Sequence, residues 1–89
     1  MFSLEFTNQY LKDLKLARKR KWDESKLNEL IQYLLSGNEL PLKYLDHRLI
    51  GKFKGLNECH ISPDWLLIYE KDTSIRLITL IRTGTHSDL

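Results

Sequence analysis

Five side chains in the second half of the chain are of types suited to proton transfer or phosphate binding. They are His47, His60, Asp64, Arg82 and His86. Histidine titrates near neutral pH and can donate or accept a proton, and the planar guanidinium of arginine can bind two phosphate oxygens at once. A single histidine is usually a surface or hydrogen-bonded residue, but these lie near predicted strand ends and turns, where sites are commonly built. The set therefore predicts acid–base chemistry.

RNA cleavage is a reaction that such a set can perform, because RNA carries its own nucleophile, the 2′-hydroxyl. The protein must then provide a base for the 2′-oxygen, an acid for the departing 5′-oxygen, and positive charge at the phosphate. An aromatic ring, Trp65 or Tyr69, can stack on an unpaired base. For Trp65, at the start of a predicted strand, packing in the core is an equally good interpretation.

Cys59 is the only cysteine. It excludes an intramolecular disulfide, which fits a reducing cytoplasm, and it leaves no second cysteine for a zinc finger or ribbon. On a strand, Glu58 and His60 share one face while Cys59 points to the other. A Cys–His nucleophile or joint metal site is therefore disfavoured, and we expect Cys59 to be a small core residue.

The elements that position these residues can be predicted from hydrophobic periodicity. Residues 2–6 alternate apolar and polar side chains, which indicates a short strand, and residues 8–20 show helical spacing. Asp23 is a plausible N-cap for a second helix, and Gly37 follows its apolar stripe as a C-terminal stop. The loop at 38–46 contains Pro41, which prevents continuation of the helix.

Four further strands are predicted after this loop, with short turns between them: 48–53, 56–61, 65–71 and 75–83. Short turns imply antiparallel pairing, because parallel pairs need long crossovers. The run WLLIYEK is apolar on both faces and should be the central strand. We predict an α+β fold, with two N-terminal helices packed on a twisted, mostly antiparallel four-stranded sheet.

Length and composition limit the class of protein. The chain has 89 residues, 42% of them hydrophobic and 29% charged, which predicts one globular domain over residues 1–89. No stretch approaches 18 consecutive apolar residues, and no signal peptide is visible. We therefore expect a cytoplasmic protein that does not cross a membrane.

Positive charge is concentrated in two places, although the net charge is only +2. Between residues 12 and 22 the predicted helix carries six Lys or Arg against a single acid. A second cluster contains Lys43, Arg48, Lys52 and Lys54. Such surfaces bind phosphate backbones by counterion release, and the alternative is a solvated helix face.

Two motifs in combination resemble a known family. The stretch from Asp46-His47 through GKFKGLNECHISPDWLLIY to LIRTGTHSDL resembles the YafQ branch of the RelE-type toxins, the mRNA-cleaving partners of bacterial toxin–antitoxin pairs. The resemblance covers essentially the whole chain. It implies a RelE-like fold and a ribosome-dependent endoribonuclease that cuts mRNA in the ribosomal A site without a metal or cofactor.

The resemblance also implies roles for individual residues. His86 and Asp64 would be the preferred proton carriers, with His60 and His47 as further candidates for the same roles. Arg82 would stabilise the transition-state phosphate. Trp65, Lys52 and Lys54 would bind the mRNA. The basic helix would bind ribosomal RNA through Lys15, Arg18, Lys19, Arg20 and Lys21.

The implied partners are the ribosome, mRNA and an acidic antitoxin of the RelB or DinJ type. The antitoxin would mask Lys15, Arg18 and their neighbours in a hetero-oligomeric complex, and would supply any operator binding.

Similar family members continue past SDL with a terminal aromatic that holds mRNA, whereas this chain ends at Leu89. The alternative is a catalytically weak module that binds ribosome, RNA or antitoxin. A toxin that binds DNA by itself is disfavoured, because no helix-turn-helix spacing is present.

Overall fold

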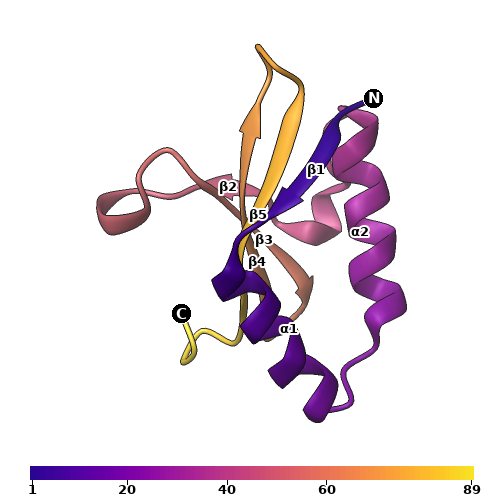
Figure 1. Cartoon of the computed structure of the whole chain (residues 1–89), viewed down its shortest axis with the longest axis vertical. Coiled ribbons are helices and arrows are strands. Elements are labelled where there is room, and N and C mark those ends of the chain that lie inside the picture. Colours follow the sequence, from indigo (N-terminus) through magenta and orange to yellow (C-terminus); the bar gives the residue numbers. More distant parts are fainter.

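The structure is a computed structural model that describes all residues from Met1 to Leu89. Its helices and strands are, in order, β1 (Ser3–Phe6), α1 (Asn8–Lys19), α2 (Glu24–Ser36), β2 (His47–Arg48), β3 (Asn57–Ser62), β4 (Trp65–Asp72) and β5 (Leu77–Gly84). Two 3-10 turns, η1 (Leu42–Tyr44) and η2 (Gly51–Phe53), flank β2. Figure 1 shows α2 beside the sheet and α1 near the C-terminal end of the chain. Neither helix has the length and apolar content that crossing a bilayer requires.

The five strands form one mixed sheet in the order β1-β5-β4-β3-β2. β2 to β5 pair in antiparallel fashion along the chain, whereas β1 pairs in parallel with β5. The α+β class and the central position of β4 are confirmed, but the predicted four-stranded sheet is wrong. Residues 3–6 add a fifth strand at the edge beside β5, and the two helices carry the chain from there towards β2 at the opposite edge.

The helix boundaries follow the predicted capping residues. The Asp23 carboxylate accepts a hydrogen bond from the Ser25 amide, and Gly37 ends α2 in the left-handed region at φ 80°. α1 is capped by Thr7, whose hydroxyl accepts from the Tyr10 amide. Local side-chain chemistry therefore defines both helices to within about one residue of the prediction.

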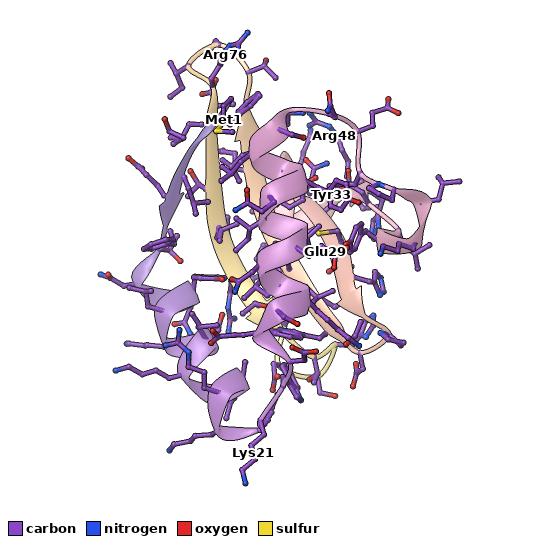
Figure 2. The ribbon with its side chains drawn as sticks, turned by 90° about the vertical axis from the view of Figure 1, so that its right-hand side faces the viewer. Met1, Lys21, Glu29, Tyr33, Arg48 and Arg76 are labelled. Carbon is purple, nitrogen blue, oxygen red and sulfur yellow. The ribbon has the colours of Figure 1, made fainter.

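Both helices pack against the same face of the sheet, and Figure 2 shows α2 lying across it, with Glu29 and Tyr33 on the helix. The core between these layers contains Tyr10 and Ala17 from α1, Leu27, Leu30 and Leu34 from α2, and Cys59, Ile61, Trp65, Leu67, Tyr69, Ile78 and Leu80 from the sheet. Burial of apolar surface in this layer is the main stabilising contribution to the fold.

The predicted strand at 48–53 is wrong in extent. Only His47 and Arg48 pair with β3, and the chain then turns through η2. Gly51 adopts φ 70°, which interrupts extended backbone, and the Ile50 side chain is exposed rather than packed. Without a buried side chain after Arg48, nothing holds this segment in the sheet.

Candidate active site

The strand register collects the predicted site residues on one face of the sheet. Directly paired residues of antiparallel strands point to the same side. One row across the sheet consists of Arg82, Ile68, Glu58 and His47. The next row consists of Gly84, Leu66 and His60. Because Cys59, Leu67 and Tyr69 alternate with these residues and point into the helix-side core, the two rows lie on the opposite face, which we call the open face.

His86 completes a cluster at one end of the open face. It follows β5, and its Nδ1 lies 3.2 Å from a carboxylate oxygen of Asp64 on the β3–β4 turn. The rings of His86 and His60 are 5.8 Å apart between centroids. Three of the five predicted residues are thus brought together, as their placement near strand ends and turns predicts.

His47 lies further along the open face, on the edge strand. Its Nε2 is 3.4 Å from a carboxylate oxygen of Glu58, and its Nδ1 is 2.9 Å from the carbonyl oxygen of Leu45. Both ring nitrogens of His47 therefore face oxygen atoms of the protein. Glu58 was not among the predicted site residues, although its position two residues before His60 on the same face was a usable signal.

Arg82 is held by a residue that the sequence did not indicate. Asp13 on α1 accepts hydrogen bonds from Arg82 Nε and Nη2, each at 3.0 Å, and from the Thr83 amide at 3.1 Å. Burial acts to raise the pKa of Asp13, but hydrogen bonds from Arg82, Gln9 and Thr83 outweigh it and lower this pKa. The bidentate contact uses one edge of the guanidinium, and Nη1 makes no hydrogen bond within the protein.

Trp65 and Tyr69 lie in the helix-side core, 3% and 2% exposed. The Trp65 indole packs against Trp22 with ring centroids 5.0 Å apart, and its N–H donates to the Thr83 hydroxyl at 2.8 Å. The Tyr69 hydroxyl donates to Asp46 at 2.7 Å, and burial raises its pKa. The core-packing interpretation of Trp65 is confirmed. In this arrangement neither ring is available to stack on a base.

The predicted cationic residues are exposed, but two of the arginines are engaged. Lys52 and Lys54 lie in and directly after η2, the loop that Figure 1 shows projecting from the sheet. On the basic helix, Arg18 forms an ion pair with Glu24, and Arg20 pairs with Asp88. The remaining predicted residues, Lys15, Lys19 and Lys21, make no ion pair within the protein.

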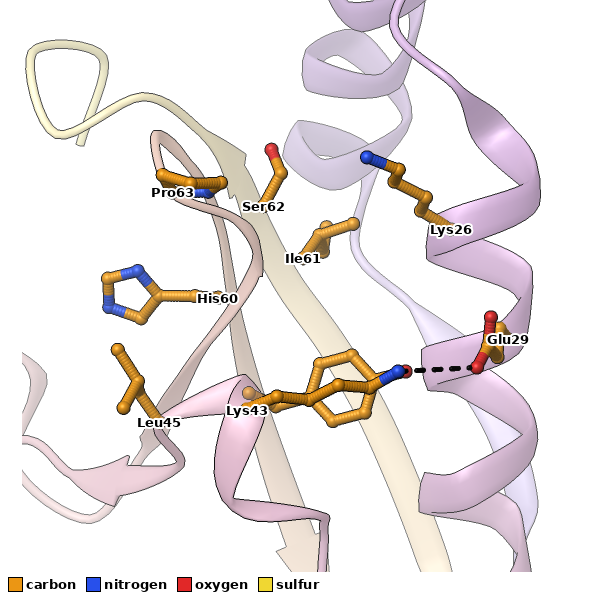
Figure 3. A pocket seen from close by; sticks show the side chains of 9 residues that line it. Lys26, Glu29, Lys43, Leu45, His60, Ile61, Ser62 and Pro63 are labelled. Atoms are coloured by element: carbon orange, nitrogen blue, oxygen red, sulfur yellow. Dashed lines mark ion pairs between the residues drawn. The ribbon is translucent and has the colours of Figure 1, made fainter.

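A cavity of about 540 Å³ lies between α2, η1 and the end of β3. Figure 3 shows that Lys26 and Glu29 line its helix side, whereas His60 projects from the other side of β3, near Leu45. His60 therefore borders this cavity but faces away from α2. Its ring is directed to the open face, which is a surface rather than an enclosed pocket.

Neither Cys59 nor any cluster of potential metal ligands forms a reactive site. Cys59 is fully buried, and burial, together with the charges of Asp46 and Glu58, raises the pKa of its thiol. The burial of Cys59 in the core cluster confirms it as a core residue, and the raised pKa disfavours the thiolate, which is the nucleophilic form. No three His, Cys, Asp or Glu side chains form a group that could hold a metal ion.

Comparison with known proteins identifies the family of this chain. Residues 2–89 match the family described as "Bacterial toxin of type II toxin-antitoxin system, YafQ". The mRNA interferase toxin YafQ of Escherichia coli K12 is 44% identical over 87 residues, which covers 97% of this chain and 92% of the relative.

Two solved structures share the fold across nearly their whole length. The toxin in the Escherichia coli DinJ–YafQ toxin–antitoxin complex superposes with a TM-score of 0.89 at 43% identity, covering 99% of this chain and 96% of that one. A metal-bound toxin from Helicobacter pylori superposes with a TM-score of 0.92 at 36% identity, covering 100% and 99%. The resemblance carried by the ECHISPDWLLIY and RTGTHSDL motifs is confirmed, and the chain belongs to the YafQ family of bacterial toxins of type II toxin–antitoxin systems.

Proposed function

We propose that this chain is an mRNA interferase, an endoribonuclease that cleaves mRNA in the ribosomal A site through attack by the RNA 2′-hydroxyl. The observation that carries the proposal is the cluster of His86, Asp64 and His60 on the open face, with two imidazole rings 5.8 Å apart. Two such groups are suited to serve the two sides of one phosphodiester. The relatives named mRNA interferase support the same reaction.

The reaction divides among the residues of the open face. A base removes the proton of the 2′-hydroxyl, the 2′-oxygen attacks phosphorus, and the bond from phosphorus to the 5′-oxygen breaks as an acid protonates that oxygen. The products are a 2′,3′-cyclic phosphate and a 5′-hydroxyl. His86 and Asp64 are the first choice as proton carriers, and His60 and His47 are further candidates for the same roles. Arg82 would use its free Nη1 to stabilise the phosphorane.

No metal is needed for this route, because the histidines move the protons and arginine supplies the positive charge. The partner of the toxin would be an acidic antitoxin, as in the DinJ–YafQ complex of Escherichia coli. Ribosomal RNA would contact the unpaired lysines Lys15 and Lys19 of α1 and Lys21 shortly after it, and mRNA would contact Lys52 and Lys54. Bound to cytoplasmic ribosomes, the protein would need no RNA-recognition domain of its own.

The proposal is tested with purified protein on ribosomes that carry a defined mRNA codon in the A site. We expect cleavage within that codon, a cyclic phosphate at the new 3′ end, and no effect of a transition-metal chelator that leaves ribosomal Mg²⁺ in place. Lys26→Ala is the matched control, because Lys26 lies on α2, away from the open face, and this variant should cleave like the wild type. Ribosome binding without cleavage would instead support a binding module, and loss of cleavage on chelation would contradict the metal-free route.

A further inference from the structure

The last residues of the chain form a closed turn that presents His86. In this C-terminal turn, residues 85–89, the amides of Asp88 and Leu89 both donate to the Thr85 carbonyl oxygen, at 3.1 and 3.2 Å. The Thr85 amide donates to Asp88 Oδ2 at 2.9 Å, and the Asp88 amide donates in return to the Thr85 hydroxyl at 3.1 Å. The turn is therefore internally hydrogen-bonded, with His86 inside it.

Asp88 also attaches this turn to the end of α1. Arg20 donates through Nη1 to Oδ2 at 2.7 Å and through Nη2 to Oδ1 at 3.2 Å. A bidentate arginine–carboxylate contact fixes both distance and orientation. The turn lies so close to β5 that a Cβ added at Gly84 would be 2.9 Å from the Asp88 side chain, so glycine is required there.

Arg20 is itself supported from the core. Its guanidinium lies over the Trp22 ring, 4.9 Å from the centroid, and Trp22 packs against Trp65. Trp65 donates to Thr83, whose hydroxyl donates to the Leu66 carbonyl oxygen at 2.6 Å. A continuous series of contacts thus joins β4, the central strand of the sheet, to the C-terminal turn.

His86 needs such support because its own contacts are weak. Its side chain is 62% exposed, and that of its partner Asp64 is 71% exposed. An exposed ion pair contributes at most about 1 kcal/mol and does not hold a side chain in place. β5 holds the chain up to Gly84, and the bidentate contact at Asp88, two residues beyond His86, holds the other end of the turn.

We propose that Arg20 and Asp88 are positioning residues that hold the C-terminal turn so that His86 faces Asp64 and His60. This inference rests on the proposed function, and it gives Arg20 a different role from the ribosomal RNA contact expected from sequence. It also gives Trp65 an indirect role, through Trp22 and Arg20, instead of contact with a base.

Single-turnover cleavage on programmed ribosomes separates these roles. If Arg20 positions His86, Arg20→Ala should lower the rate constant at saturating toxin by about 10- to 100-fold, because a misplacement of about 1 Å can cost this much. The half-saturating toxin concentration should change by less than about threefold. Arg20→Lys, which keeps the charge but loses the fork, should recover part of the rate. Arg76→Ala, which removes an exposed arginine just before β5, at the end of that strand distant from His86, should leave the rate constant unchanged.

The opposite kinetic result would overturn the proposal. If Arg20→Ala raises the half-saturating concentration and reduces the salt dependence of binding while the saturating rate stays the same, Arg20 is an RNA contact. Asp88→Asn, which keeps an acceptor for the Thr85 amide but removes the charge, should slow cleavage in the same way as Arg20→Ala.

A second measurement is independent of activity. Amide NMR relaxation should give rigid order parameters near 0.85 for residues 85–88 in the wild type, and values below about 0.6 in Arg20→Ala and Asp88→Asn. Spectra of the remaining residues show whether each variant is folded. If the wild type is inactive but these order parameters change as expected, the proposed function fails and the anchoring of the turn stands. Unchanged order parameters in both variants would refute the anchoring itself.

Discussion

The two faces of the sheet are built from the same three strands and differ in what covers them. On the helix side, β3, β4 and β5 contribute Cys59, Leu67 and Ile78, which are fully buried against α1 and α2. On the open face the same strands contribute His60, Leu66 and Arg82. One face is therefore a packed core, whereas the other carries polar side chains beside buried apolar ones.

The difference shows why the central strand is apolar on both sides. Leu66 and Ile68 point to the open face and are 1% exposed, yet they do not belong to the helix-side core cluster. Other side chains must therefore cover them on the open face. The two faces should consequently respond differently to substitution.

The largest effect is expected on the open face, at His86. His86→Ala removes a proposed proton carrier and should lower the rate of mRNA cleavage by about 10²- to 10⁴-fold. Because the side chain is exposed, the free energy of unfolding should change by no more than about 0.5 kcal/mol. Cleavage on programmed ribosomes and urea denaturation measure the two quantities. Equal cleavage by both proteins would remove His86 from the mechanism.

The next largest effect is expected on the helix side, at Leu67. Leu67→Ala leaves a cavity in the core and should reduce the free energy of unfolding by about 2 to 5 kcal/mol. The folded fraction should cleave mRNA at the wild-type rate, because the side chain points away from the open face. Urea denaturation, with cleavage measured well below the transition, tests this. A slower folded protein would mean that the two faces are coupled.

The smallest effect is expected at Asp13, which links the faces by holding Arg82. Its lowered pKa stabilises the fold at pH values above about 4, the unfolded value, and this contribution is lost as pH falls through the folded value. Asp13→Asn should lower the free energy of unfolding by about 1 to 3 kcal/mol at pH 7. Below pH 4 its stability should fall less steeply with pH than that of the wild type. Cleavage should also slow, since Arg82 loses its orientation.

Asp72→Asn is the matched comparison for Asp13. Hydrogen bonds from Ser74 and Ile75 lower the pKa of Asp72, the last residue of β4, which pairs with the end of β5 distant from His86. This variant should also lose acid-sensitive stability, measured by urea denaturation from pH 7 to 3, but it should cleave normally. Normal cleavage by Asp13→Asn as well would show that Arg82 does not depend on the contact.

Much of the architecture was predictable because its signals are local. The helix boundaries follow from residues next to them, Asp23 and Gly37, whose capping contacts involve only the adjacent turns. The burial of Cys59 and the shared face of Glu58 and His60 follow from strand alternation alone. The family motifs placed His60, Asp64 and His86 in one candidate site, and in the structure His86 lies beside both of the others.

Other features depend on partners distant in the chain, and no local pattern specifies them. Asp13 meets Arg82 and Arg20 meets Asp88 only because α1 runs beside the end of β5. The parallel pairing of β1, the short β2 and the burial of Trp65 likewise depend on which surfaces meet. By itself, the sequence determined the elements, their faces and the chemical types of the site residues, since these follow from periodicity and side-chain chemistry. Only the tertiary structure decided which charges are paired and which remain free for RNA, because pairing depends on three-dimensional distance.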